Sequence, residues 1–260
     1  WGLPALGGAG AGLGTSLALY LGSALYLLQT WRAAREHGFL RARPSRATLR
    51  NILRISLPNG VQQFFFATGL TVLFWIIGRV GADEVAVAHI LITLILFLIL
   101  PAIGLGLSAA SLVGQALGRR DADDAYRWGW DVTRLAVSLL FVLALPMWLV
   151  PDLILGLFLK QPALVELGRA PLMITGLAIC LDGVAIIFTQ ALLGAGAARS
   201  VMVVTLAVQW FFFLPLAYII GPVLGYGLLG IWLAQAFQRL ITSLLLSGLW
   251  IKRGWAHIEL

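Results

Sequence analysis

The sequence predicts an all-α integral membrane protein, a helical bundle of about seven transmembrane helices. Apolar residues make up 60% of the chain and charged residues only 11%, against roughly 45–50% and about 25% in ordinary soluble domains. Several runs also reach the ~20 apolar residues that a helix needs to cross a bilayer. These runs are continuous, whereas the strands of a membrane barrel would alternate apolar and polar residues over segments of ~10 residues. The pattern therefore favours helices over a barrel.

Seven runs, almost free of charge, have the length of a transmembrane helix. In chain order they cover approximately residues 5–31, 55–78, 88–118, 135–158, 170–194, 200–220 and 224–250. Pro101, Pro146 and Pro215 lie inside the third, fourth and sixth of these runs. We interpret these prolines as helix kinks, because proline lacks the backbone N–H and clashes with the preceding turn.

The basic residues indicate how the helices are oriented. Arginines crowd the connection between the first two runs: Arg32, Arg35, Arg41, Arg43, Arg46, Arg50 and Arg54. The positive-inside rule makes this connection cytoplasmic. Successive connections lie on opposite sides of the membrane, so a second set of basic residues is also cytoplasmic: Arg119, Arg120, Arg127, Arg134, Arg199, Lys252 and Arg253. We therefore predict a multi-pass protein of the plasma (inner) membrane with a cytoplasmic C-terminus. The net charge of +7 reflects this sorting, and no nucleic-acid partner is expected.

The first and last runs resemble one another and suggest a repeat. They enter through Pro4-Ala5-Leu6-Gly7 and Pro222-Val223-Leu224-Gly225, and both end in a tryptophan close to basic residues. Many transporters contain such repeats, and six helices is a natural unit. The domain prediction is as follows: the last helix of an N-terminal lobe (1–31), a basic cytoplasmic inter-lobe linker (32–54), a six-helix C-terminal transport lobe (55–252) and a cytoplasmic tail (253–260). We expect the chain to be a fragment whose partner is the missing N-terminal lobe.

Three segments resemble the multidrug and toxic compound extrusion (MATE) transporters. The most specific runs from Leu100 to Arg127 and reads LPAIGLGLSAASLVGQALGRRDADDAYR; the others are PALGGAGAGLGTSLA from Pro4 and FTQALLGAGAARSVM from Phe188. The resemblance implies twelve helices in two lobes around a central cleft. It also implies secondary-active efflux of organic cations, drugs or other amphipathic solutes, driven by inward flow of protons or sodium.

Asp182 is the only charged residue between Ala170 and Ala198. Acids in the middle of a span are costly, at least ~2.5–3.5 kcal/mol, and usually functional. The resemblance implies that a carboxylate at this place takes part in cation coupling. Sodium-coupled members also carry a glutamate where Phe66 stands, eight residues after Pro58, and often a tyrosine where Ala178 stands. We therefore expect antiport coupled to H⁺ rather than Na⁺.

Polar side chains recur at helical spacing on three of the runs and sketch a cleft, since they should face other helices or water. Besides the cation-coupling Asp182, the candidate substrate-cleft residues are Asn59, Gln62, Gln63, Phe66, Thr175, Thr189, Gln235 and Arg239. Each has a structural alternative. Arg239 in particular could hold Asp182 permanently ionised as a buried ion pair.

Other functions are less well supported by the residues. His37, His89 and His257 are far apart and Cys180 is the single cysteine, so we expect no metal site, no cofactor and no enzymatic activity. A lipid-linked oligosaccharide flippase of the same superfamily would favour a cleft rich in Arg and Lys, but only Arg239 lies in mid-membrane. A non-transport, structural role is the remaining alternative, and Asp182 together with the polar stripes argues against it.

Overall fold

The computed structural model describes residues 7–34 and 45–257, and within these ranges every regular element is a helix. The predicted all-α fold is thus confirmed. By its internal contacts the chain divides into two compact units, residues 1–53 and 54–260. The division falls next to the predicted boundary between linker and transport lobe.

The first unit contains α1 (Gly7–Ala34), which covers the first predicted run. Its large apolar side chains are exposed, including Leu17, Tyr20 and Tyr26. Such exposure suits a helix surrounded by lipid or by other helices. Arg35, Arg41 and Arg43 of the predicted linker lie outside the described residues, while the end of that linker is helical, because α2 begins at Arg46.

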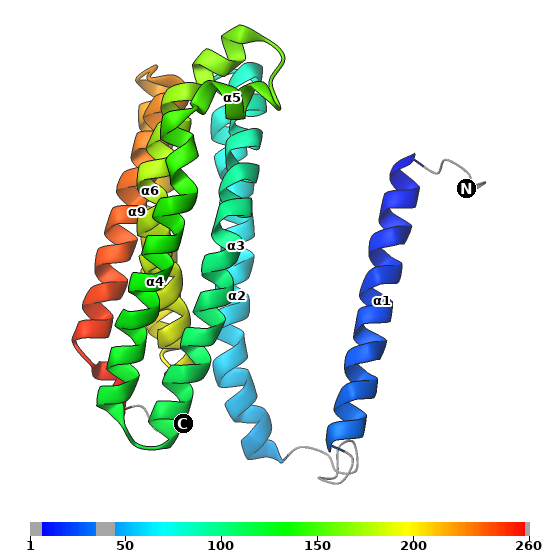
Figure 1. The fold of residues 1–260 in the computed structure, drawn as a ribbon, viewed down its shortest axis with the longest axis vertical. Coiled ribbons are helices and arrows are strands. Elements are labelled where there is room, and N and C mark those ends of the chain that lie inside the picture. The colour runs from blue at the N-terminus through cyan, green and yellow to red at the C-terminus, as the bar shows by residue number, and fades with distance from the viewer. Residues whose placement is uncertain (1–6, 35–44, 258–260) are drawn as a thin grey trace. The chain divides into compact units, whose positions relative to one another are not determined.

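The second unit is a bundle of long helices (Figure 1). Its elements are α2 (Arg46–Gly78, which starts in the first unit), α3 (Ala82–Gly118), α4 (Ala122–Leu149), the short α5 (Pro151–Gly156), α6 (Pro162–Gly194), α7 (Ala198–Leu206), η1 (Ala207–Phe213), α8 (Leu214–Tyr218), η2 (Ile219–Val223), α9 (Gly227–Ile251) and η3 (Gly254–His257). Within the described residues, six stretches are long and apolar enough to cross a membrane, with α7 to η2 forming one of them.

The observed helices extend beyond the predicted apolar runs. The run predicted at 135–158 covers the larger part of α4, which already begins at Ala122 and ends at Leu149, and the separate short α5. Asp121 starts this helix, because its Oδ1 accepts a hydrogen bond from the backbone N–H of Asp124 at 2.9 Å, a typical N-cap. An apolar run marks only the part of a helix that lies in lipid, so the polar first turns were missed.

The sixth span is not a regular α-helix. It contains two π-helical stretches, η1 and η2, separated by the short α8, in which Pro215 occupies the first turn. Pro222 lies inside η2. A proline cannot donate the hydrogen bond of a regular turn, and π-helical turns are a known local response to such interruptions. The sequence predicted a kink at Pro215 but not this change of helix type.

The helix α6 is the central element of the bundle and packs against α3, α4 and α9, as Figure 1 shows. Small residues allow this close packing, which in lipid depends on contact rather than on exclusion of water. At Gly194, for example, a Cβ atom would lie only 2.4 Å from the carbonyl oxygen of Ala110 on α3. No side chain larger than a hydrogen fits at this crossing.

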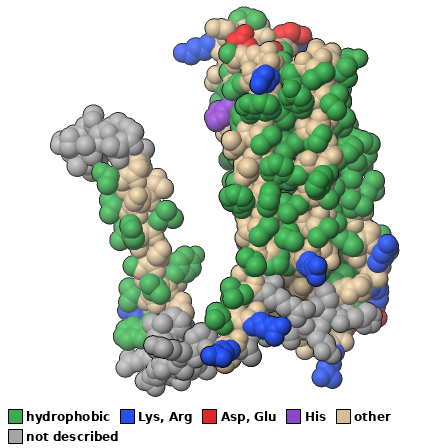
Figure 2. Space-filling view, turned by 180° about the vertical axis from the view of Figure 1, so that it is seen from behind, with side chains coloured by type: hydrophobic (Ala, Val, Ile, Leu, Met, Phe, Trp, Pro, Cys, Tyr) green, Lys and Arg blue, Asp and Glu red, His purple; other side chains and the backbone are tan. Residues whose placement is uncertain are grey.

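Apolar side chains cover the middle of the second unit, and charged side chains gather toward its two ends (Figure 2). Leu96, Phe97, Leu107, Leu177 and Phe211 are examples of the exposed apolar surface. A surface of this kind is stable in a bilayer and not in water. Together with the six spans, it identifies a multi-pass membrane protein.

The α3–α6 crossing can be tested with a pair of matched substitutions in the full-length protein. Gly194→Ala should lower the free energy of unfolding by about 1–3 kcal/mol, because the added methyl group overlaps backbone. Gly104→Ala on α3 has no atom within 4 Å of its Cβ, so it should be neutral or stabilise by up to ~1 kcal/mol through helix propensity. Thermal unfolding in detergent measures both; equal stability of the two variants would contradict the described crossing.

Candidate functional site

Asp182 and Arg239 form an ion pair between α6 and α9. Arg239 Nη1 donates a hydrogen bond to Asp182 Oδ2. The two side chains are mostly buried, with 18% of Asp182 and 11% of Arg239 accessible. Both residues lie well inside membrane-spanning stretches. The contact is the geometry expected if Arg239 serves as the partner of the acid.

A second contact joins the same two helices two turns earlier. Trp232 Nε1 donates to Thr175 Oγ1 at 3.0 Å, and Thr175 Oγ1 donates in turn to the carbonyl oxygen of Pro171 at 2.9 Å. Thr175 and Trp232 are almost completely buried. Their contact therefore satisfies polar groups that have no access to solvent.

The two contacts share one register. Each joins residues that are 57 positions apart, and each partner in the second contact lies seven residues before its counterpart in the first. The helices α6 and α9 therefore run parallel, with contacts about 10 Å apart along the axis at ~1.5 Å per residue. We call these four residues, Thr175, Asp182, Trp232 and Arg239, the α6–α9 seam.

Small residues on both helices make the seam possible. Ala178 on α6 and Ala234 on α9 are 3% accessible each, and both lie on the contacting stretches between the two polar links. Alanine lets two backbones approach while keeping helix propensity. A larger side chain at Ala178 would occupy space between the two helices, one turn before Asp182.

The remaining candidate cleft residues are not part of these contacts. Thr189 on α6 and Gln235 on α9 are half-buried on the same two helices. On α2, Gln63 and Phe66 are exposed and Gln62 is half-buried. Among the described residues, none of these makes a hydrogen bond to Asp182 or Arg239, and the side chain of Asn59 lies outside the described part.

Gln62 differs from its neighbours because its Oε1 is buried without a hydrogen-bond partner. The Nε1 of Trp210, in the π-helical η1, is buried and unpartnered as well. The two helices meet here: the ring of Phe65 packs edge-on against Trp210 at 5.5 Å. The sequence predicts Gln62 as a cleft residue, and the structure adds Trp210 as its buried, unpartnered neighbour on the facing helix.

One residue of the seam was not predicted from the sequence. Trp232 was not among the candidate site residues, although it precedes Arg239 by the same seven positions that separate Thr175 from Asp182. The missing information was which helices pair. Without it, the shared seven-residue spacing of Thr175 and Asp182 on one helix and of Trp232 and Arg239 on another does not show that these residues are in contact.

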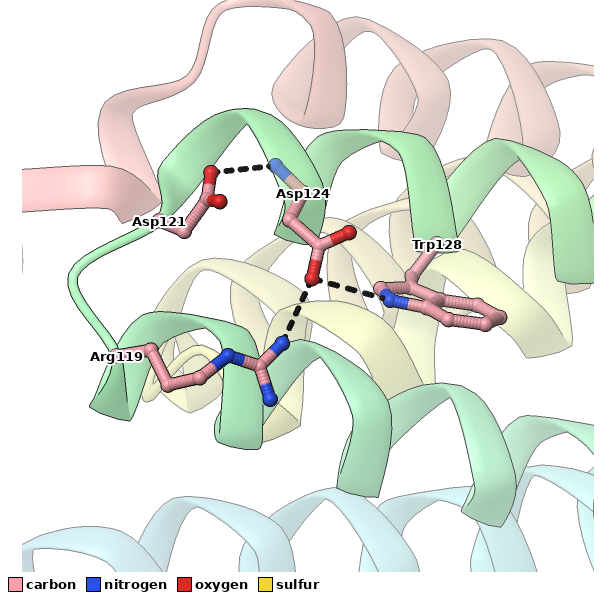
Figure 3. A network of polar contacts seen from close by, with 4 residues as sticks. All are labelled: Arg119, Asp121, Asp124 and Trp128. Atoms are coloured by element: carbon pink, nitrogen blue, oxygen red, sulfur yellow. Dashed lines mark hydrogen bonds and ion pairs between the residues drawn. The ribbon is translucent and has the colours of Figure 1, made fainter.

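A separate polar network closes the connection between α3 and α4 (Figure 3). Arg119 Nη2 and Trp128 Nε1 both donate to Asp124 Oδ2, at 2.8 and 3.3 Å. Asp121 accepts from the Asp124 backbone N–H. These contacts fix the turn between the two helices.

The described residues contain no group of three or more His, Cys, Asp or Glu side chains placed to hold a metal ion. The ionisable side chains of the seam are one carboxylate, Asp182, and one guanidinium, Arg239. The carboxylate can bind and release a proton, whereas the guanidinium stays charged and can only change its hydrogen-bond partner.

Comparison with known proteins gives a consistent result. The sequence profile of the MatE family matches residues 58–219, more than half of the chain. The chain is 27% identical over 267 residues to the "Probable multidrug resistance protein NorM" of Thermotoga maritima, covering 98% of this chain and 56% of that protein. It is 31% identical over 242 residues to the protein of the same name from Pseudomonas aeruginosa, covering 89% and 49%. The chain thus spans about half the length of these relatives.

Solved structures show the same fold. A MATE crystal structure in the straight conformation superposes with a TM-score of 0.80 at 18% identity, covering 90% of this chain and 54% of that one. The outward-facing conformation of a multidrug resistance MATE family transporter gives a TM-score of 0.75 at 20% identity, with coverages of 82% and 48%. At this level of identity the match concerns the fold alone.

The Thr175–Trp232 link can be tested by Thr175→Val in the full-length protein. The variant leaves the indole N–H buried without an acceptor, so the free energy of unfolding should fall by about 0.5–2 kcal/mol. Thr133→Val is the control, because Thr133 is equally buried but bonds only to Gly129 O of its own helix. If both variants lose the same stability, or if Trp232→Phe fails to cancel the difference, the link does not stabilise the seam.

Proposed function

This chain belongs to the MatE family, the multidrug and toxic compound extrusion transporters, and we propose that the protein containing it is a proton-coupled efflux antiporter. Its substrates would be organic cations, drugs or other amphipathic solutes. In this proposal residues 1–31 are the last helix of the N-terminal lobe, 32–54 link the lobes, 55–252 form the C-terminal transport lobe and 253–260 a cytoplasmic tail. The protein would lie in the plasma membrane with its C-terminus inside.

The observation that carries the proposal is the Asp182–Arg239 pair. The ionised Asp182 and Arg239 side chains together carry no net charge. In a site of low dielectric, one additional positive charge would raise the electrostatic free energy. A proton on Asp182 adds one positive charge to the seam, and so does a cationic substrate. The two therefore exclude one another electrostatically, which is the competition that antiport requires.

Arg239 has a definite role in this scheme. When neither proton nor substrate is present, its guanidinium neutralises Asp182 and keeps the carboxylate from remaining unpaired. Either ligand must displace this contact, so occupancy changes how α6 and α9 are joined. Alternating access needs such a link between occupancy and helix packing.

The seam residues favour protons over sodium. A sodium ion would need several oxygen ligands, but the hydroxyl oxygen of Thr175 already accepts from Trp232, and the carboxylate oxygen Oδ2 of Asp182 accepts from Arg239. A proton needs only one lone pair of the carboxylate, and Phe66 and Ala178 supply no further oxygen.

The main alternative is that Asp182 and Arg239 are a purely structural pair. Removing one member of a buried pair then leaves an uncompensated charge and costs about 3–5 kcal/mol. Two groups that serve only each other should be replaceable together by neutral residues. Two groups used in coupling should not.

The substitution Asp182→Asn in the full-length protein distinguishes the two roles. Asparagine retains size and a hydrogen-bond acceptor but binds no proton at neutral pH, so proton-driven efflux from proteoliposomes should be abolished while the protein remains inserted. The control is Asp182→Asn combined with Arg239→Gln. We expect the pair of substitutions to recover any lost thermal stability but not efflux; recovery of both would assign the ion pair a structural role only.

The coupling ion is tested separately, in proteoliposomes that contain the full-length protein and a pH gradient. We expect efflux of a lipophilic cation without sodium, at a rate that added sodium does not change. Collapse of the pH gradient by an ionophore should stop it. Strict dependence on a sodium gradient would refute proton coupling.

A further inference from the structure

One end of the second unit carries an excess of positive charge. This is the end where α3, α6 and α9 finish and where α4 and α7 begin, joined by a shared core that includes Val113, Ala125, Val201 and Trp250. Among the described residues, seven basic and four acidic side chains lie there, an excess of three: Arg119, Arg120, Arg127, Arg134, Arg199, Lys252 and Arg253 against Asp121, Asp123, Asp124 and Asp131.

The acids are largely engaged already. Ion pairs join Arg119 to Asp124 at 2.8 Å, Arg134 to Asp131 at 3.2 Å and Arg253 to Asp123 at 2.5 Å. Arg127 forms no ion pair in the described part of the chain. Its guanidinium is therefore available for an anion from outside the protein.

Arg127 lines a surface pocket on α4 together with Tyr126, Trp130, Asp131 and Arg134. The spacing of three and four residues places Arg127, Trp130, Asp131 and Arg134 on one helix face, with the two arginines about 10 Å apart along the axis at ~1.5 Å per residue. We call this the α4 pocket. Among the described contacts, the indole N–H of Trp130 has no hydrogen-bond acceptor, so it is a second free donor beside Arg127. Arg134 pairs with Asp131 through Nη1, and its other guanidinium N–H groups remain for a ligand.

The aromatic walls of the α4 pocket are held in place from behind. Trp130 packs edge-on against Phe188, with ring centroids 5.0 Å apart. Tyr126 stacks on Trp250, and the guanidinium of Arg253 lies 4.2 Å from the Tyr126 ring. The aromatic walls of the pocket are thus preorganised, and the exposed side chains of Arg127 and Arg134 stand beside them.

The same face of α4 becomes apolar beyond the pocket. Phe141 follows Arg134 by one heptad and is 46% accessible, and Leu135 and Val142 are 57% and 59% accessible. Paired arginines and aromatic rings next to an exposed apolar stripe are typical of the boundary between headgroups and hydrocarbon. A free anion would make no contact with the apolar side chains of Leu135, Phe141 and Val142, whereas the acyl chain of a lipid would cover them.

We propose that the α4 pocket binds an anionic phospholipid. Its phosphate would accept hydrogen bonds from Arg127, Arg134 and the indole of Trp130, and its acyl chains would lie along Leu135, Phe141 and Val142. Charge-assisted bonds from arginine to phosphate are the strongest available at such a surface. This site lies outside the seam and goes beyond the proposed transport function.

The proposal is tested on the full-length protein in nanodiscs that mix phosphatidylglycerol with phosphatidylcholine. Native mass spectrometry would count the phosphatidylglycerol molecules that remain bound after the protein is released from the nanodisc. The test variant is Arg127→Gln with Arg134→Gln, and the control is Arg120→Gln with Arg199→Gln, which removes the same charge from the same end outside the pocket. We expect retention to fall roughly tenfold or more in the test variant, since charged hydrogen bonds are lost, and to change little in the control.

Further outcomes separate the possible ligands. Trp130→Phe should weaken retention less than the double arginine variant, because it removes one neutral donor and keeps the ring. Equal losses in test and control variants would mean a general attraction of the basic end, and no preference for phosphatidylglycerol would mean no such site. Displacement of the lipid by soluble inorganic phosphate would assign the pocket to a free anion. Each of these three results overturns the proposal.

Discussion

The ion pair between Asp182 and Arg239 is the interaction on which the organisation of this bundle depends. A charge inside a bilayer has no water to stabilise it, so each residue requires the other as long as both are charged. The requirement fixes α6 and α9 in parallel register, and the Thr175–Trp232 contact one heptad earlier repeats the same offset. Any event that neutralises or displaces one partner removes the reason for that register.

The position of α6 explains why a change at the Asp182–Arg239 pair can affect the whole second unit. This helix packs against α3, α4 and α9, and its crossing with α3 leaves no room for a Cβ at Gly194. Closely packed helices move as rigid bodies rather than by local deformation. In the proposed mechanism, a change at the seam would shift α6 relative to its neighbours, which is the form of motion that alternating access requires.

The fold was predictable from the sequence because each spanning helix must satisfy its own backbone in lipid, so length and apolarity alone identified the spans. The ends of the helices were harder to predict, because Asp121, for example, caps α4 within a polar stretch that carries no hydropathy signal. For the site, the sequence singled out Asp182, Arg239 and Thr175 but not Trp232. Residues on different helices find one another through tertiary packing, and the π-helical turns around Pro215 depend on the same packing.

The central claim is that a proton and a cationic substrate compete for Asp182, and proton release on substrate binding tests it most directly. Binding of tetraphenylphosphonium to the purified full-length protein would be followed in a weakly buffered solution with a pH-sensitive dye, over a range of pH. At a pH where the site is protonated, wild-type protein should release up to one proton per bound cation, and Asp182→Asn should release none. Binding without proton release in the wild type at every pH, or the same release in both proteins, would contradict the account.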